Sequence, residues 1–149
     1  MNRINIVMRL VLSLPFPTPL SGRLMLLRLT GRETGRIYRM PVSYIRHEDV
    51  LLTPGGGRWT LNLSNDHLVP VRLRGRKITA RPELISDPDE VEPLLDIMVA
   101  ANPAAQRFIR IPRDPDGRLN RTALTNATKY GFRIVRWHLN PADLPARRR

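Results

Sequence analysis

Arginines and glycines cluster in the stretch "LTGRETGRIYRMPVSYI", which covers residues 29–45. Arg32 and Arg36 each follow a glycine, Gly31 and Gly35, and runs of strand-forming residues lie on both sides. Guanidinium groups bind phosphates and carboxylates through charge-assisted hydrogen bonds, and free backbone N–H groups of a glycine turn bind the same anions. Glycines between two strands are equally typical of an ordinary hairpin turn. The stretch is therefore either a plain basic hairpin or a clamp for the phosphate of a bound cofactor.

The composition fits one packed domain that attracts anions. The chain has 149 residues, of which 42% are hydrophobic, and it has no cysteine. Disulfides, a thiolate nucleophile and Cys-ligated metal sites are therefore excluded. Lys and Arg number 25 against 13 Asp and Glu, which gives a formal net charge of +12. Such a charge attracts nucleic acid, anionic lipid or a phosphorylated, carboxylated cofactor.

The residue types most often used in catalysis give no second recognisable site. His47, His67 and His138 are isolated and lack metal-ligand spacing, so we expect no metal site. Ser43 and Ser64 lack a nucleophile-elbow motif or a recognisable base. The 2 Trp, 3 Tyr and 3 Phe are too few and too scattered for a base-stacking platform, so we expect no specific nucleic-acid partner. The catalytic residues stay unassigned.

The elements that position the arginine and glycine stretch are expected to be mostly β-strands. The pattern predicts strands over residues 24–30, 37–46, 50–53, 68–74, 77–86 and 132–139. Pro41 in the second of these indicates an edge strand, a bulge or a turn of the backbone toward a ligand. The last strand is far from the others in sequence and must pair at long range, which favours closure of a barrel. Residues 54–57, "PGGG", predict a flexible loop, and residues 58–64 predict a brief helical turn.

Helices are expected at the N-terminus and in the second half of the chain. Ser86 or Asp87 caps a helix that continues to about residue 102, with Pro88 in its first turn. Shorter helices are predicted over residues 103–109 and 122–129. Arg9 interrupts an apolar run that is too short for a spanning helix, and no cleavage pattern for export follows. Residues 2–14 therefore predict a short helix that packs on the domain or lies in a membrane interface.

The order of these features resembles the deazaflavin-dependent nitroreductase and quinone reductase family. The likeness runs from about Leu26 to Trp137, and it includes "WTLNL", "VPVRLRGRKITARPEL" and "FRIVRW". Its most specific part is the Thr-Gly-Arg-x-Thr-Gly motif at 30–35 in combination with Trp59, Asn62 and Leu63. The resemblance implies a mainly β protein with added helices (α+β), a split β-barrel of the FMN-binding, pyridoxamine-phosphate-oxidase-like type. The domain would span residues 21–139, after an N-terminal arm at 1–20 and before a basic tail at 140–149.

The resemblance also implies a cofactor, the 8-hydroxy-5-deazaflavin coenzyme F-420. Its reduced form passes a hydride to quinones, nitro compounds or other electron-poor substrates. The family's hairpin residues correspond here to Arg32, Thr34 and Pro41, and its residues beside the deazaflavin ring correspond to Trp59 and Asn62. The coenzyme carries a phosphodiester and a polyglutamate tail, for which the hairpin supplies cations and backbone N–H groups. The expected cofactor-binding residues are Gly31, Arg32, Thr34, Gly35, Arg36, Pro41, Trp59 and Asn62.

The chain lacks some of the basic residues that are usual in the family. Family members usually carry Lys or Arg at the position of Glu33 and an arginine at the position of Tyr38. Arg39 is therefore one residue out of register with the family's arginine and faces the other side of its strand. The loop at 53–59 is shorter than usual and lacks a lysine. Either the arginines at 36, 58 and 74 replace the missing cations, or the barrel binds a fatty acid, another hydrophobic ligand or FMN.

The expected partners are an anionic cofactor and a small hydrophobic substrate. The expected location is the cytoplasm; contact of the N-terminal helix with the inner face of the membrane and a homodimer both stay open. Tyr38, Tyr44, Tyr130 or water could deliver the proton that the reduced product needs.

Overall fold

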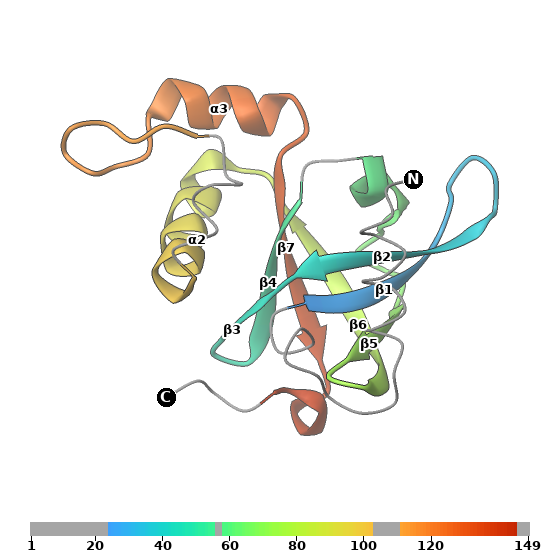
Figure 1. Cartoon of the computed structure of the whole chain (residues 1–149). Coiled ribbons are helices and arrows are strands. Elements are labelled where there is room, and N and C mark those ends of the chain that lie inside the picture. The colour runs from blue at the N-terminus through green and yellow to red at the C-terminus, as the bar shows by residue number, and fades with distance from the viewer. Residues whose placement is uncertain (1–23, 56–57, 103–110, 146–149) are drawn as a thin grey trace.

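The computed structural model describes residues 24–55, 58–102 and 111–145 (Figure 1). Within these residues, seven strands form one antiparallel sheet in the order β2-β1-β5-β6-β7-β4-β3, which curls into a half-barrel. The strands are β1 (Leu24–Thr30), β2 (Ile37–Ser43), β3 (Ile45–His47), β4 (Val50–Gly55), β5 (Val69–Leu73), β6 (Arg76–Ile85) and β7 (Arg133–Leu139). The helices are η2 (Arg58–Asn62), α2 (Pro88–Ala101), α3 (Arg121–Lys129) and η4 (Pro141–Asp143).

The β1–β2 hairpin carries the arginine and glycine motif at its tip. The two strands pair from Leu24↔Ser43 to Thr30↔Ile37, and the intervening residues project beyond the sheet (Figure 1). Met25, Leu27 and Leu29 of β1 point into the core inside the curl. Side chains of the alternate residues therefore lie on the outer face of the sheet. The predicted first strand is confirmed with its bounds.

The predicted strand at 37–46 is two strands that lie at opposite edges of the sheet. β2 and β3 are separated by Tyr44 alone, which is 7% exposed. One continuous piece of chain thus connects the two edges of the curled sheet. The edge position expected from Pro41 is confirmed, since β2 is an edge strand. A proline there removes no hydrogen bond from the ladder if its missing N–H would face away from the partner strand.

The last strand pairs at long range as expected, but it does not close a barrel. β7 lies in the interior of the sheet between β6 and β4, with Trp137 opposite both Pro82 and Leu51. The β4 strand also continues through Pro54 to Gly55, which pairs with Arg133, so the first two residues of the predicted "PGGG" loop are strand. β7 therefore joins the two halves of the sheet.

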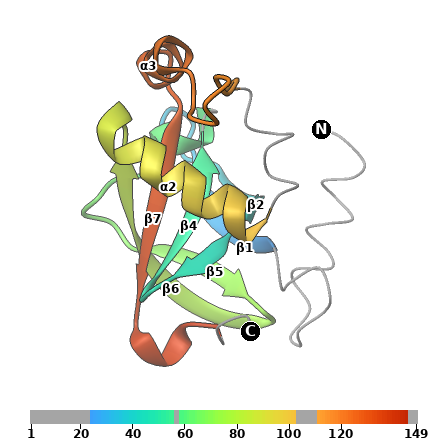
Figure 2. The same cartoon turned by 90° about the vertical axis from the view of Figure 1, so that its left-hand side faces the viewer.

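Two hydrophobic cores lie on opposite faces of the sheet. The inner core contains Leu27, Leu51, Val71 and Trp137, and the indole N–H of Trp137 donates to Thr53 Oγ1 at 3.1 Å. The outer core is formed where α2 and α3 cover part of the sheet around β4 and β7 (Figure 2). The outer face of β1, β2 and β5 lies outside this second core.

The two helices begin at the caps that their sequences provide. Asp87 Oδ1 accepts a hydrogen bond from the Asp89 N–H at 2.9 Å, and Pro88 occupies the first turn of α2, as predicted. Val91, Leu94, Leu95 and Met98 form the buried face of this helix. The predicted helix at 122–129 is α3, which Asn120 caps at the Ala123 N–H.

A charged cluster on the outer face of β6 and β7 makes stability depend on pH. Glu83 Oε1 lies 2.8 Å from His138 Nε2 and 3.2 Å from Arg136 Nη1. The hydrogen bond with His138, followed by the charge of Arg136, holds the pKa of Glu83 below its ordinary value. A lowered folded-state pKa stabilises the fold above the unfolded pKa, about 4.3, and this contribution is lost as the pH falls through the folded pKa.

We therefore expect Glu83→Gln to lower the free energy of unfolding at pH 7 by about 0.5 kcal/mol, because the carboxylate is partly exposed. The difference from wild type should shrink toward zero below about pH 4. Urea unfolding at several pH values measures it. A difference that stays constant down to pH 3 would contradict the role of this carboxylate.

Some predicted features lie outside the described residues. These are the helices at 2–14 and 103–109, the glycines at 56–57, the side chain of Arg58 and the last part of the basic tail.

Candidate functional site

Asn62 connects the hairpin tip to the helical turn η2. Its Oδ1 accepts a hydrogen bond from the backbone N–H of Arg32 at 2.7 Å, and its Nδ2 donates to the Tyr38 hydroxyl. The resemblance placed Asn62 beside the deazaflavin ring, and the structure gives its amide oxygen and nitrogen these two partners within the protein. The two parts of the sequence motif, residues 30–35 and the segment that contains Asn62, are thereby brought together at one end of the half-barrel.

Tyr38 and Arg39 point to opposite faces of β2, as the register predicted. Tyr38 packs against the inner core and meets Asn62, whereas Arg39 lies on the outer face beside Arg28. The family's usual arginine at position 38 is thus replaced by a tyrosine that contributes to the contact between hairpin and η2. Its hydroxyl does not supply the positive charge that an arginine would bring.

The two glycines shape the tip of the hairpin and use their N–H groups within it. The Gly31 N–H donates to the Arg36 carbonyl at 2.7 Å, and the Gly35 N–H donates to the Gly31 carbonyl at 2.9 Å. Gly35 has φ of 69°, a left-handed conformation that favours glycine. The expectation that these two N–H groups are free for an anion is therefore wrong, because the turn itself needs them.

Trp59 lies on η2, where close packing fixes its position. The side chain is half-buried against the inner core. A Cβ atom added to Gly55 would lie 3.4 Å from Trp59 Cζ2 and 2.8 Å from the buried Thr60 methyl carbon. Only glycine therefore lets η2 pack this closely on the end of β4. Sequence reasoning treated Gly55 as part of a flexible loop and missed this role.

Other expected site residues lie elsewhere. Pro41 pairs with Leu26 at the outer face, on the opposite side of β2 from Tyr38 and Asn62. Arg74, with φ of 50°, is in the β5–β6 turn, at the other end of the sheet from the hairpin tip (Figure 1). It is therefore too far away to replace a cation at the tip. Arg36 remains at the tip and is exposed.

Exposed apolar side chains occur on the elements at the tip end of the sheet. Tyr130 follows α3 and is 81% exposed, and Leu61 of η2 is 61% exposed. Both views place the α3–β7 connection and η2 at this same end (Figures 1 and 2). Of the three tyrosines named as candidate proton donors, Tyr44 is buried and the Tyr38 hydroxyl is bound to Asn62, so Tyr130 is the accessible one. The end of the half-barrel thus combines exposed arginines, the half-buried Trp59 and exposed apolar side chains.

Comparison with known proteins assigns a family to this arrangement. The model of the F420H(2)-dependent quinone reductase family matches residues 5–114. The chain belongs to this family. No match occurs among curated proteins. One solved structure that resembles the chain is the protein Atu2129, of unknown function, from Agrobacterium tumefaciens str. C58.

The likeness to that structure supports the fold alone. The sequence identity is 16% and the TM-score is 0.55, over 94% of this chain. This chain spans only 58% of the length of that protein chain. The curled antiparallel sheet is consistent with the split β-barrel that the resemblance implied. Among the described residues, no helix has the length and apolar character to cross a membrane.

Proposed function

We propose that this protein is a reductase that uses coenzyme F-420 and passes a hydride to a quinone or a similar electron-poor compound. The family match over residues 5–114 supports the cofactor class. The observation that carries the proposal for this chain is the connection through Asn62, which holds the cationic tip beside the helical turn of Trp59. The motif that predicted the cofactor from sequence is thus assembled in one place.

The residues at the tip fit the anionic part of the coenzyme. Arg32 and Arg36 are both exposed, and the ion pairs within the described residues involve neither of them. All 13 Asp and Glu residues of the chain lie within the described ranges, so this absence covers every acidic side chain. Two guanidinium groups without acidic partners can bind a phosphodiester or glutamate carboxylates.

The aromatic and apolar residues fit the planar ring and the substrate. Trp59 would form a wall against the ring, and Asn62 would act as a positioning residue that holds the tip. When bound, the reduced coenzyme supplies the hydride. The exposed Tyr130 or water would deliver the proton, and Leu61 would contact a hydrophobic substrate. Orientation of the two reactants is the main contribution of the protein.

The double variant Arg32→Ala/Arg36→Ala tests the role of the tip. We expect it to weaken coenzyme binding at least ten-fold and to flatten the salt dependence, since each charge-assisted contact contributes about 1.5–3 kcal/mol. The variant Arg118→Ala/Arg121→Ala removes the same charge on the α2–α3 side and serves as the control. Binding of the oxidised coenzyme and menadione-dependent oxidation of the reduced form measure the effect. Equal affinity in the two double variants would refute the proposed tip contact.

A further inference from the structure

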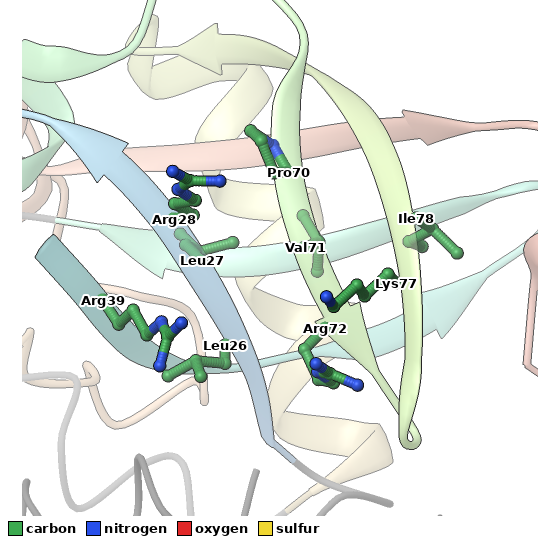
Figure 3. A pocket seen from close by; sticks show the side chains of 9 residues that line it. All are labelled: Leu26, Leu27, Arg28, Arg39, Pro70, Val71, Arg72, Lys77 and Ile78. Atoms are coloured by element: carbon green, nitrogen blue, oxygen red, sulfur yellow. The ribbon is translucent and has the colours of Figure 1, made fainter. Parts of the chain in front are cut away.

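A basic cavity lies on the outer face of the sheet, away from Trp59. Its volume is about 140 Å³, and it is formed by β1, β2, β5 and β6 (Figure 3). The basic side chains of Arg28, Arg39, Arg72 and Lys77 lie around an apolar floor that includes Leu26. Leu26 is only 4% exposed. The cavity thus combines four positive charges with an apolar base.

The strand register sets like charges directly opposite each other. Arg28 pairs with Arg39 across β1 and β2, and Arg72 pairs with Lys77 across β5 and β6. Leu26 lies two residues before Arg28 in β1 and is opposite Arg72 of β5, so the two pairs are neighbours in the sheet. Like charges in directly opposite positions destabilise a sheet. Two such pairs side by side therefore disfavour the folded state unless an anion lies between them.

No acidic side chain of the chain offsets these charges. The ion pairs of the described residues use other cations, although every Asp and Glu lies within the described ranges. Arg72 Nη1 is 3.4 Å from the Gly75 carbonyl oxygen, a neutral acceptor. Some acidic residues elsewhere pair with other arginines, for example Asp89 with Arg121 and Glu92 with Arg118. Since no acidic side chain supplies a counter-charge, solvent ions or a ligand can supply it.

We propose that this cavity is a binding site for a phosphate group, carried by a soluble phosphate compound or by a lipid headgroup. Its volume corresponds to about five water molecules at about 30 Å³ each, which is room for a phosphate and the first atoms attached to it. Three arginines can donate paired hydrogen bonds to phosphate oxygens, and Lys77 adds a compact point charge. The apolar floor of Leu26 excludes water beneath the anion and strengthens these contacts.

The site is separate from the proposed coenzyme site. Arg39 and Tyr38 are consecutive in β2, so their side chains lie on opposite faces, and Tyr38 meets Asn62 on the inner side. A ligand in the cavity therefore contacts the outer face of the hairpin, whereas Trp59 packs against the inner core. Occupation of one site does not require the other.

Pyrophosphate is the probe for this proposal, at low ionic strength and with the full-length protein. The variant Arg39→Ala/Lys77→Ala removes one cation from each like-charge pair, and Arg118→Ala/Arg121→Ala is the charge-matched control. We expect pyrophosphate to raise the melting temperature of wild type and control, because a ligand of the folded state stabilises it. Calorimetry should give at least ten-fold weaker binding for Arg39→Ala/Lys77→Ala. Without pyrophosphate, this variant should melt no lower than wild type, since it relieves repulsion, whereas the control loses two ion pairs.

Vesicles with and without phosphatidic acid assign the source of the phosphate. Selective loss of cosedimentation in Arg39→Ala/Lys77→Ala indicates a lipid headgroup, and unchanged cosedimentation together with lost pyrophosphate binding indicates a soluble compound. Equal pyrophosphate affinity in the two double variants would overturn the proposal. So would a loss of coenzyme F-420 affinity confined to Arg39→Ala/Lys77→Ala, which would assign the cavity to the anionic part of the coenzyme. The pyrophosphate arm does not depend on the proposed reductase activity.

Discussion

Replacement of Trp59 by alanine is expected to lower kcat/KM for menadione about 100-fold and to weaken coenzyme binding. The indole is the aromatic wall of the proposed ring site, and close packing on Gly55 holds it in place. A factor of 100 corresponds to about 2.7 kcal/mol, which is of the size expected for a large buried side chain. Equilibrium dialysis with oxidised coenzyme and steady-state oxidation of the reduced coenzyme measure the two effects.

Trp59→Phe is the matched control, because it keeps an aromatic wall. We expect it to retain binding and turnover within a few-fold of wild type. Trp137 also emits, so a Trp137→Phe background is used for the fluorescence measurements; its indole is fully buried and bonded to Thr53. The quench that the coenzyme causes should therefore be smaller in both Trp59 variants, whereas only Trp59→Ala loses turnover. Turnover of Trp59→Ala equal to that of Trp59→Phe would remove the tryptophan from the site.

Replacement of Gly55 by alanine is expected to destabilise the protein by about 1–3 kcal/mol and to weaken coenzyme binding. The new Cβ would lie 2.8 Å from the Thr60 methyl carbon, and Thr60 is only 5% exposed. Since that side chain cannot swing into solvent, η2 must move, and Trp59 and Asn62 move with it. Urea unfolding and coenzyme titration measure the two consequences.

Gly31→Ala provides a control with the same nominal clash. Its Cβ would lie 2.8 Å from Thr34 Oγ1, but Thr34 is exposed and its side chain can rotate away at the cost of one long hydrogen bond, 3.3 Å, from the Arg36 N–H. We expect a stability change of about 0.5 kcal/mol or less, because a substitution from glycine also reduces the entropy of the unfolded chain. A loss of stability in Gly31→Ala as large as in Gly55→Ala would show that tight packing under η2 is not the cause.

The sequence predicted the elements well where the signals were local. The bounds of β1 follow from a short apolar run, and the start of α2 follows from its capping residues. The helix predicted over 122–129 is α3, which begins one residue earlier. The path of the chain from one sheet edge to the other could not be predicted, since the sequence of residues 37–46 shows no strand break at Tyr44. The bend there depends on the curl of the whole sheet. The interior position of β7 likewise depends on pairing with β4 and β6 at once.

The candidate site was predictable as a set of residues but not as a set of contacts. The motif pointed to Arg32, Trp59 and Asn62, and the register of Arg39 was inferred correctly from strand alternation. The use of the Gly31 and Gly35 N–H groups by the turn was not foreseen, because it requires the backbone conformation of the tip. The partners of Asn62 required the fold, which brings residues 24 and 30 positions apart into contact.

The most direct measurement is a parallel titration of the purified full-length protein with oxidised coenzyme F-420, FMN and palmitate. The proposed function predicts micromolar or tighter binding of coenzyme F-420, with tryptophan quenching that is reduced in Trp59→Ala, and weaker binding of the other two. Arg32→Ala/Arg36→Ala should lose affinity for coenzyme F-420, whereas Arg118→Ala/Arg121→Ala should not. Tight binding of palmitate or FMN with no detectable binding of coenzyme F-420 would contradict the reductase proposal.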